Sequence, residues 1–286
     1  MGRTSGQEIA PRCGGWPSLH TFRVFSMIRS LLVVGAALSL SACFAAQPMP
    51  ESRPALISDR PDFTEATAIV DPKRVQVEMG QTITRDGTLR ETTVGEVLIR
   101  AGLADGIELR VSPNSWLRAS EGGTVTSGLQ DANIGFKIRL LEGSEDPSWR
   151  PELSVITHTT VPTGAAAFRA PRLQPEIKLL AAWPLSERVA LSSNVNVSRP
   201  VDGGRAFTEY AGSLSLGVAM NDRVAGYIEG FGFAPQDGSD TVNRYLNGGF
   251  TYLLSPDVQF DIRAGVGPTR SLSKTHFYGI GLVVRR

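Results

Sequence analysis

The residues of this chain that could do chemistry are few and lie on short segments of alternating polarity. Thr157-His158-Thr159-Thr160 places His158 and Thr160 two residues apart, which puts a base and a hydroxyl on one face of a strand. Threonine is a weaker choice of nucleophile than serine, and the segment offers no third residue to orient the histidine. We therefore expect His158 to be a hydrogen-bonding group and the protein not to be an enzyme, with an outer-membrane hydrolase as a remote alternative.

Other kinds of site find little support in the composition. The only cysteines are Cys13 and Cys43, both near the N-terminus, and His158 and His276 are the only histidines after residue 46, so we expect no transition-metal site and no cofactor. The glycines of 226–232 follow a strand pattern rather than a phosphate-binding turn. With 29 Lys+Arg against 28 Asp+Glu, the net charge of +1 gives no reason to expect nucleic acid.

Charged residues recur on one face of successive strand-like segments. Pairs such as Glu108 with Arg110 lie two apart, which puts both on the same side of a strand. A soluble core excludes such charges, whereas the polar interior of a membrane barrel accepts them. The residues expected to line this lumen are Glu78, Arg100, Glu108, Arg110, Lys137, Arg139, Glu176, Lys178, Asp261 and Arg263.

The elements that must position these residues are amphipathic strands. In 133–140 every even position is apolar and every odd one is polar or glycine, which indicates a strand with one apolar and one wet face. Turn residues separate such segments every 35 to 41 residues, roughly the length of one hairpin. The turns centre on Asp105, Asp146, Glu187, Asp222 and Asp257, and more variable loops lie around 112–127, 162–172, 199–206 and 234–244.

Five turns and six loops require twelve strands with both termini on the turn side. This pattern predicts an all-β protein, a transmembrane antiparallel up-and-down β-barrel of about twelve strands. A soluble β-sandwich also has alternating strands, and periodicity alone does not separate the two. The apparent export signal and the aromatic residues near strand ends favour the barrel; these are Trp116, Trp183, Tyr210, Tyr252 and Tyr278.

The N-terminal region resembles an export signal. Residues 27–46 have a short basic head, an apolar stretch and small residues before a polar one, so we expect a signal peptide there and an upstream extension over 1–26. Two cleavage sites remain open. Leu40-Ser41-Ala42-Cys43 resembles a lipobox, which would make Cys43 a lipidated first residue, whereas ordinary cleavage would follow Ala45 or Ala46.

Residues 47–73 precede the expected barrel, which covers 74–286. Their prolines and charges suit either a periplasmic tail or a segment that plugs the lumen. The residues that would form such a plug or gate are Asp59, Arg60, Asp62 and Glu65.

A family resemblance supports the same fold. The run from Asp59 to Glu65, the run from Asp71 to Gly80, and Val161-Pro162-Thr163-Gly164 resemble a bacterial family of outer-membrane β-barrels labelled as transporters, or as the meta-pathway phenol degradation family. The resemblance implies location in a Gram-negative outer membrane, contact with its lipid and with the barrel-assembly machinery, and passage of small hydrophobic or aromatic molecules. It carries over no catalytic residue. The last strand departs from a common barrel ending, since it closes on Arg285-Arg286 rather than on an aromatic residue.

The sequence thus predicts an outer-membrane channel or transporter, passive or facilitated, for a small-molecule solute. The alternative is a non-transporting barrel, or a lipid-anchored β-protein, with a structural or binding role.

Overall fold

The computed structural model describes residues 56–143, 150–235, 242–267 and 275–286. In this part no helix is long and apolar enough to cross a bilayer. The strands are β1 (Val75–Asp86), β2 (Leu89–Ala104), β3 (Ile107–Ser112), β4 (Trp116–Glu121), β5 (Thr124–Leu129), β6 (Ala132–Leu141), β7 (Glu152–Val161), β8 (Gln174–Pro184), β9 (Val189–Ser198), β10 (Val201–Asp202), β11 (Arg205–Ala206), β12 (Glu209–Ala219), β13 (Val224–Ala234), β14 (Asn243–Ser255), β15 (Val258–Gly267) and β16 (Thr275–Arg285).

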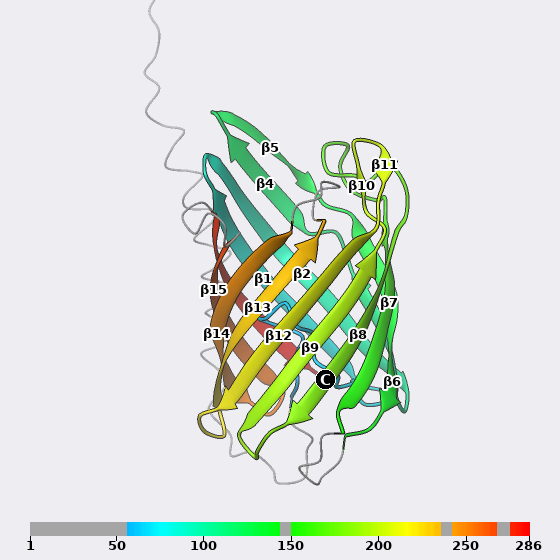
Figure 1. The fold of residues 1–286 in the computed structure, drawn as a ribbon, viewed down its shortest axis with the longest axis vertical. Coiled ribbons are helices and arrows are strands. Elements are labelled where there is room, and N and C mark those ends of the chain that lie inside the picture. Colours follow the sequence, from blue (N-terminus) through cyan, green and yellow to red (C-terminus); the bar gives the residue numbers. More distant parts are fainter. Residues whose placement is uncertain (1–55, 144–149, 236–241, 268–274) are drawn as a thin grey trace, which may run out of the picture. The chain divides into compact units, whose positions relative to one another are not determined.

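Twelve of these strands close into one antiparallel barrel (Figure 1). The order around the wall is β1, β2, β3, β6, β7, β8, β9, β12, β13, β14, β15 and β16, and β16 pairs with β1. The amide of Val75 donates to the carbonyl of Arg286 over 2.9 Å, and the amide of Arg286 returns a bond of 2.8 Å to Val75. The twelve described strands of the wall therefore form a closed ring, and a bilayer requires that spanning strands leave no edge unpaired. The predicted all-β barrel of twelve strands is confirmed.

The connections agree with the predicted hairpin period, but two of the expected loops contain short strands. The region 199–206 contains the paired strands β10 and β11. The turns at Asp105, Glu187, Asp222 and Asp257 each join consecutive barrel strands, whereas Asp146 lies outside the described residues. The region 112–127, expected to be a variable loop, instead contains β4 and most of β5, and β4 pairs with the first half of β2. The two strands flank a Gly-Gly turn and extend beyond the barrel at its loop end (Figure 1).

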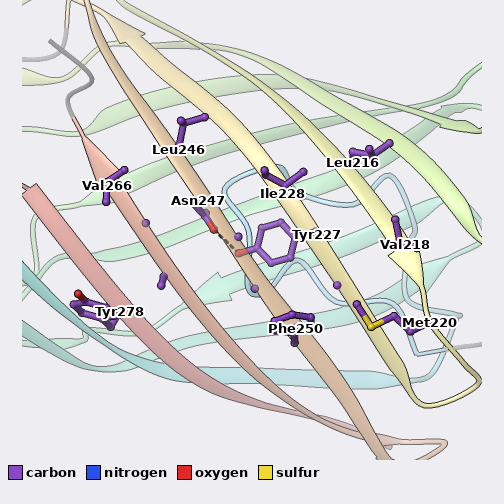
Figure 2. Close-up of a pocket in the computed structure, with 15 residues that line it drawn as sticks. Leu216, Val218, Met220, Tyr227, Ile228, Leu246, Asn247, Phe250, Val266 and Tyr278 are labelled. Atoms are coloured by element: carbon purple, nitrogen blue, oxygen red, sulfur yellow. Dashed lines mark hydrogen bonds between the residues drawn. The ribbon is translucent and has the colours of Figure 1, made fainter. Parts of the chain in front are cut away.

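The outward face of the wall is apolar, as lipid contact demands. Ile228 on β13 and Tyr278 on β16 are 63% and 54% exposed. Small outward residues on three neighbouring strands, Gly226, Gly248 and Ala264, leave a shallow hollow of about 630 Å³ there (Figure 2). This hollow faces the bilayer, so its natural content is lipid.

The expected extension, signal peptide and lipidation site at Cys43 all fall within residues 1–55, which lie outside the described residues.

Candidate functional site: a segment inside the barrel

Residues 56–71, which we call the inner segment, run through the barrel interior before β1 begins. Their side chains and backbone bond to inward-facing residues of strands on opposite walls. The segment joins the wall beside β2, where Lys73 donates to the carbonyl of Gly102 over 3.0 Å. A side chain at Gly102 would overlap the backbone of Asp71, so this close crossing of two chains requires glycine.

Asp59 lies at the centre of the first contact region and is only 6% exposed. Its carboxylate accepts two bonds of 3.0 Å from Lys137 Nζ and one from the Arg110 guanidinium, and Arg100 Nη1 lies 3.5 Å away. Asp59 belongs to the inner segment and not to a spanning strand. Burial alone would raise its pKa, but the Arg100, Lys137 and Arg110 cations hold the pKa well below its usual range. Asp59 therefore stays ionised and anchors the segment.

Glu65 makes a second anchor on the same wall. Arg110 Nη2 lies 2.9 Å from Glu65 Oε1, and Lys178 Nζ lies 2.9 Å from Glu65 Oε2. Arg110 thus binds Asp59 through one guanidinium nitrogen and Glu65 through the other. Two carboxylates of the segment are held by cations from β2, β3, β6 and β8.

Arg60 attaches the inner segment to the wall on both sides of β1. Its guanidinium lies 3.1 Å from Glu96 on β2 and 3.4 Å from Asp261 on β15, and it donates to the Ile280 carbonyl over 3.1 Å. The side chain fits against Gly281 of β16, where any Cβ would overlap it. The missing side chain in the wall is therefore part of the binding site for Arg60.

Glu229 on β13 accepts hydrogen bonds from the backbone of the inner segment. The amides of Phe63 and Thr64 and the hydroxyl of Thr64 all donate to its carboxylate, with distances of 2.9 Å for Phe63 and 2.6 Å for the hydroxyl. Asn247 Nδ2 supplies a fourth bond of 2.7 Å. Glu229 is not among the charges predicted to line the lumen, because it stands as a single charge among glycines and aromatic residues. The available signal was the alternation along β13, which places Glu229 on the inward face.

Asp62 of the inner segment lies close enough to Glu229 for their charges to interact. Ser215 donates to it over 3.1 Å, but no cation is among its main influences. Burial and the neighbouring Glu229 carboxylate raise the pKa of Asp62 well above its usual range. The segment thus carries two acids that favour docking when ionised, Asp59 and Glu65, and one that opposes it, Asp62.

Aromatic rings surround Phe63 on the inner face of β13 and β14. The Phe63 ring stacks on Phe231 with centroids 4.6 Å apart, and Phe231 stacks on Tyr245 at 5.0 Å. Phe233 meets Phe63 edge-on, and Phe277 lies beside Phe231. Stacked and edge-on pairs are the favoured geometries for aromatic side chains, so the lumen offers a surface suited to planar rings.

The structure brings together most of the charges predicted to line the lumen. Arg100 donates to Glu78 over 3.0 Å and to Glu108 over 2.8 Å, next to Arg110 and Lys137. Arg263, on the Asp261 side, donates to the Pro61 carbonyl over 2.9 Å. Arg139 lies apart from this network, near the turn end, where it pairs with the exposed carboxylates of Asp105 and Glu142.

His158 and Thr160 do not form a nucleophile and base pair. His158 Nε2 lies 2.6 Å from Glu176 Oε2, and the Thr160 hydroxyl accepts a bond from Asn133 over 3.3 Å. Glu176, expected in the lumen, is thus the hydrogen-bond partner of the histidine.

The inner segment leaves space on its turn side. A cavity of about 510 Å³ is lined there by Ser58, Pro61 and Asp62 of the segment and by Ser192, Ser215 and other residues of the wall. The segment therefore crosses the lumen with this cavity on its turn side and the aromatic rings around Phe63 beside it.

A closed twelve-stranded barrel with an apolar belt and a charged interior defines the class of outer-membrane β-barrels. The chain belongs to the family described as "Putative MetA-pathway of phenol degradation", whose sequence profile matches residues 58–285. Among curated proteins no sequence matches it.

One solved structure shows the same fold at low sequence identity, and two others match less closely. An outer membrane channel from Pseudomonas putida F1 is 14% identical, with a TM-score of 0.57, over 77% of this chain and 97% of the other. The NanC porin (10% identical, TM-score 0.48) and the KdgM porin in complex with disordered oligogalacturonate (11% identical, TM-score 0.46) each match over 73% of this chain and 98% of their own.

Proposed function

We propose that the protein is an outer-membrane channel for small organic molecules, and that the inner segment closes its lumen. One observation carries this proposal: the segment is bound across the interior, by Asp59 and Glu65 to lysines of β6 and β8 and by the Phe63 and Thr64 amides to Glu229 on β13. Eight-stranded barrels are filled by their own side chains, and barrels of 16 or more strands leave open channels. A twelve-stranded lumen is of intermediate width, so sixteen residues of backbone would obstruct it.

The solute class follows from the aromatic rings around Phe63. Planar molecules of about the size of a benzene ring could stack on Phe231 or Tyr245 once Phe63 withdraws. The family description, which refers to phenol degradation, agrees with such a solute. The proposed function needs no catalytic residue and no cofactor. The barrel would reach its membrane through the barrel-assembly machinery.

The test is single-channel conductance in planar bilayers, measured for the intact protein and for a variant that lacks residues 48–66. We expect the intact protein to be mostly closed and the deletion variant to show regular conductance steps. Heat-modifiable migration on gels checks that both barrels are folded. Silence from both folded proteins would contradict a channel and would favour the structural or binding alternative.

A disulfide lock tests closure without removing any chain. The Thr64 and Ser213 hydroxyl oxygens lie 2.8 Å apart, so cysteines at these two positions should bond when oxidised. We expect the oxidised T64C/S213C protein to conduct less than its reduced form. Equal conductance before and after reduction would mean that the inner segment does not control the pore.

A further inference from the structure

The wall of β2, β3, β6 and β8 carries a cluster of inward cations, which we call the cationic patch: Arg100, Arg110, Lys137 and Lys178. The acids of the wall itself neutralise only part of it. Arg100 has Glu78 and Glu108 as partners, and Arg110 shares Glu108.

Lys137 depends on the inner segment. Its ammonium group bonds to both carboxylate oxygens of Asp59 and to the carbonyls of Ala66 and Ala68, at 2.7 to 3.4 Å, and all these acceptors belong to the segment. Lys178 has Glu65 at 2.9 Å and Glu176 only at 3.9 Å. When the segment withdraws, both lysines lose their nearest anions.

Buried cations without anions are costly, so the vacated positions attract a replacement carboxylate. Asn196 adds a second, independent observation. It faces Lys178 across the β8–β9 pairing and is only 2% exposed, and its Oδ1 atom has no hydrogen-bond partner among the residues that the structure describes. The Asn196 Oδ1 atom beside the cations could accept a hydrogen bond from a ligand hydroxyl or from a bound water.

We propose that the cationic patch is a binding site for small organic carboxylates, which the inner segment occupies with Asp59 and Glu65 when the lumen is closed. The solute and the segment then compete for the same cations. An organic acid that binds the patch stabilises the open lumen, and it is recognised through carboxylate groups. This inference rests on the proposed function, because it requires the segment to leave the patch.

The test measures binding directly and does not need a conducting pore. Isothermal titration calorimetry of the full chain in detergent compares succinate with its uncharged analogue succinamide. The double variant D59N/E65Q keeps the size of both side chains but removes the two negative charges that compete with succinate. We expect succinate to bind this variant at least about tenfold more tightly than it binds the wild type, because charge-assisted hydrogen bonds become available.

Adding K137Q and K178Q to that variant should weaken succinate binding by at least about tenfold. R139Q in the same background is the matched control, because Arg139 lies on the strand of Lys137 but pairs near the turn end. We expect R139Q to change nothing. The single variant E65Q removes only the carboxylate partner of Lys178, so it repeats the binding measurement with less risk of misfolding.

Three results would overturn the proposal: no succinate binding to folded D59N/E65Q and E65Q, equal binding of succinamide, or equal losses from R139Q and from the lysine variants. Reversal potentials of D59N/E65Q in a salt gradient give a second readout, with anion selectivity expected. Absence of conductance would contradict the channel, whereas calorimetry would still decide on the carboxylate site.

Discussion

Replacement of Glu229 by glutamine should release the middle of the inner segment. Four donors meet the Glu229 carboxylate: the amides of Phe63 and Thr64, the Thr64 hydroxyl and Asn247. A glutamine side chain keeps a single oxygen, which accepts at most two of these bonds, and places an NH₂ group against the remaining donors.

The magnitude follows from the bonds that are lost. A hydrogen bond to a charged group contributes about 1.5–3 kcal/mol, so two lost bonds cost about 3–6 kcal/mol. Removing the repulsion between Glu229 and Asp62 offsets part of this loss, so the lower end, about 3 kcal/mol, is the better guide. That value corresponds to about a 100-fold shift toward the released segment.

Hydrogen exchange followed by mass spectrometry is the assay, because Phe63 and Thr64 bond to Glu229 through their amides. In E229Q these amides should exchange about 100-fold faster than in the wild type, while strand amides stay protected. E209Q is the matched control: Glu209 is a partly buried acid on neighbouring β12 that bonds to Ser198 rather than to the segment. Unchanged exchange in a folded E229Q barrel would refute the reasoning.

Three further predictions concern the same segment. G281V should displace Arg60 and increase the open fraction of single channels, and an unchanged open fraction would show that Arg60 does not need this slot. Because the docked segment holds Asp62 with a raised pKa, it binds more protons than the released one, so docking should weaken as pH rises above the ordinary value of 3.8. The wild-type open fraction should therefore increase as the pH rises above that value, and D62N should flatten this dependence. Parallel pH profiles of the two proteins would contradict the role of Asp62. F63A should lose about 0.5–1.5 kcal/mol of ring-stacking energy in addition to the energy of the buried ring surface, and amide hydrogen exchange at Thr64 should become faster. Exchange at the wild-type rate would contradict that contribution.

The barrel could be predicted because each strand carries its own pattern. Alternation over 133–140 specifies an apolar and a wet face within eight residues, and turn residues fix the hairpin period. The β4–β5 hairpin was not predicted, although Gly122-Gly123 followed by the β-branched run Thr124-Val125-Thr126 is a hairpin signal. The region 112–127 resembles one long connection because Trp116–Glu121 has no regular alternation of apolar and polar residues.

The pairing of charges inside the barrel could not be predicted. The alternation along its strand predicts that Lys137 faces the lumen. Its partner Asp59 lies 78 residues earlier in the chain, and no local sequence signal identifies either residue as the partner of the other. The wall brings β2, β3, β6 and β8 into one arc, and only the closed barrel defines which charges the inner segment meets. The alternation along β13 could predict that Glu229 faces the lumen, but its role as acceptor for backbone amides depends on the path of the inner segment.

Arg60 has a consequence for the order of assembly. Its guanidinium bonds to β2 on one side of the β1–β16 seam and to β15 and β16 on the other. All three partners are in place only after the last strand, ending at Arg285, has paired with β1. The inner segment is translated before every strand of the wall, yet its binding site is complete only when the final strand closes the barrel. Docking of these early residues should therefore be the last folding step, with a rate that reports on barrel closure.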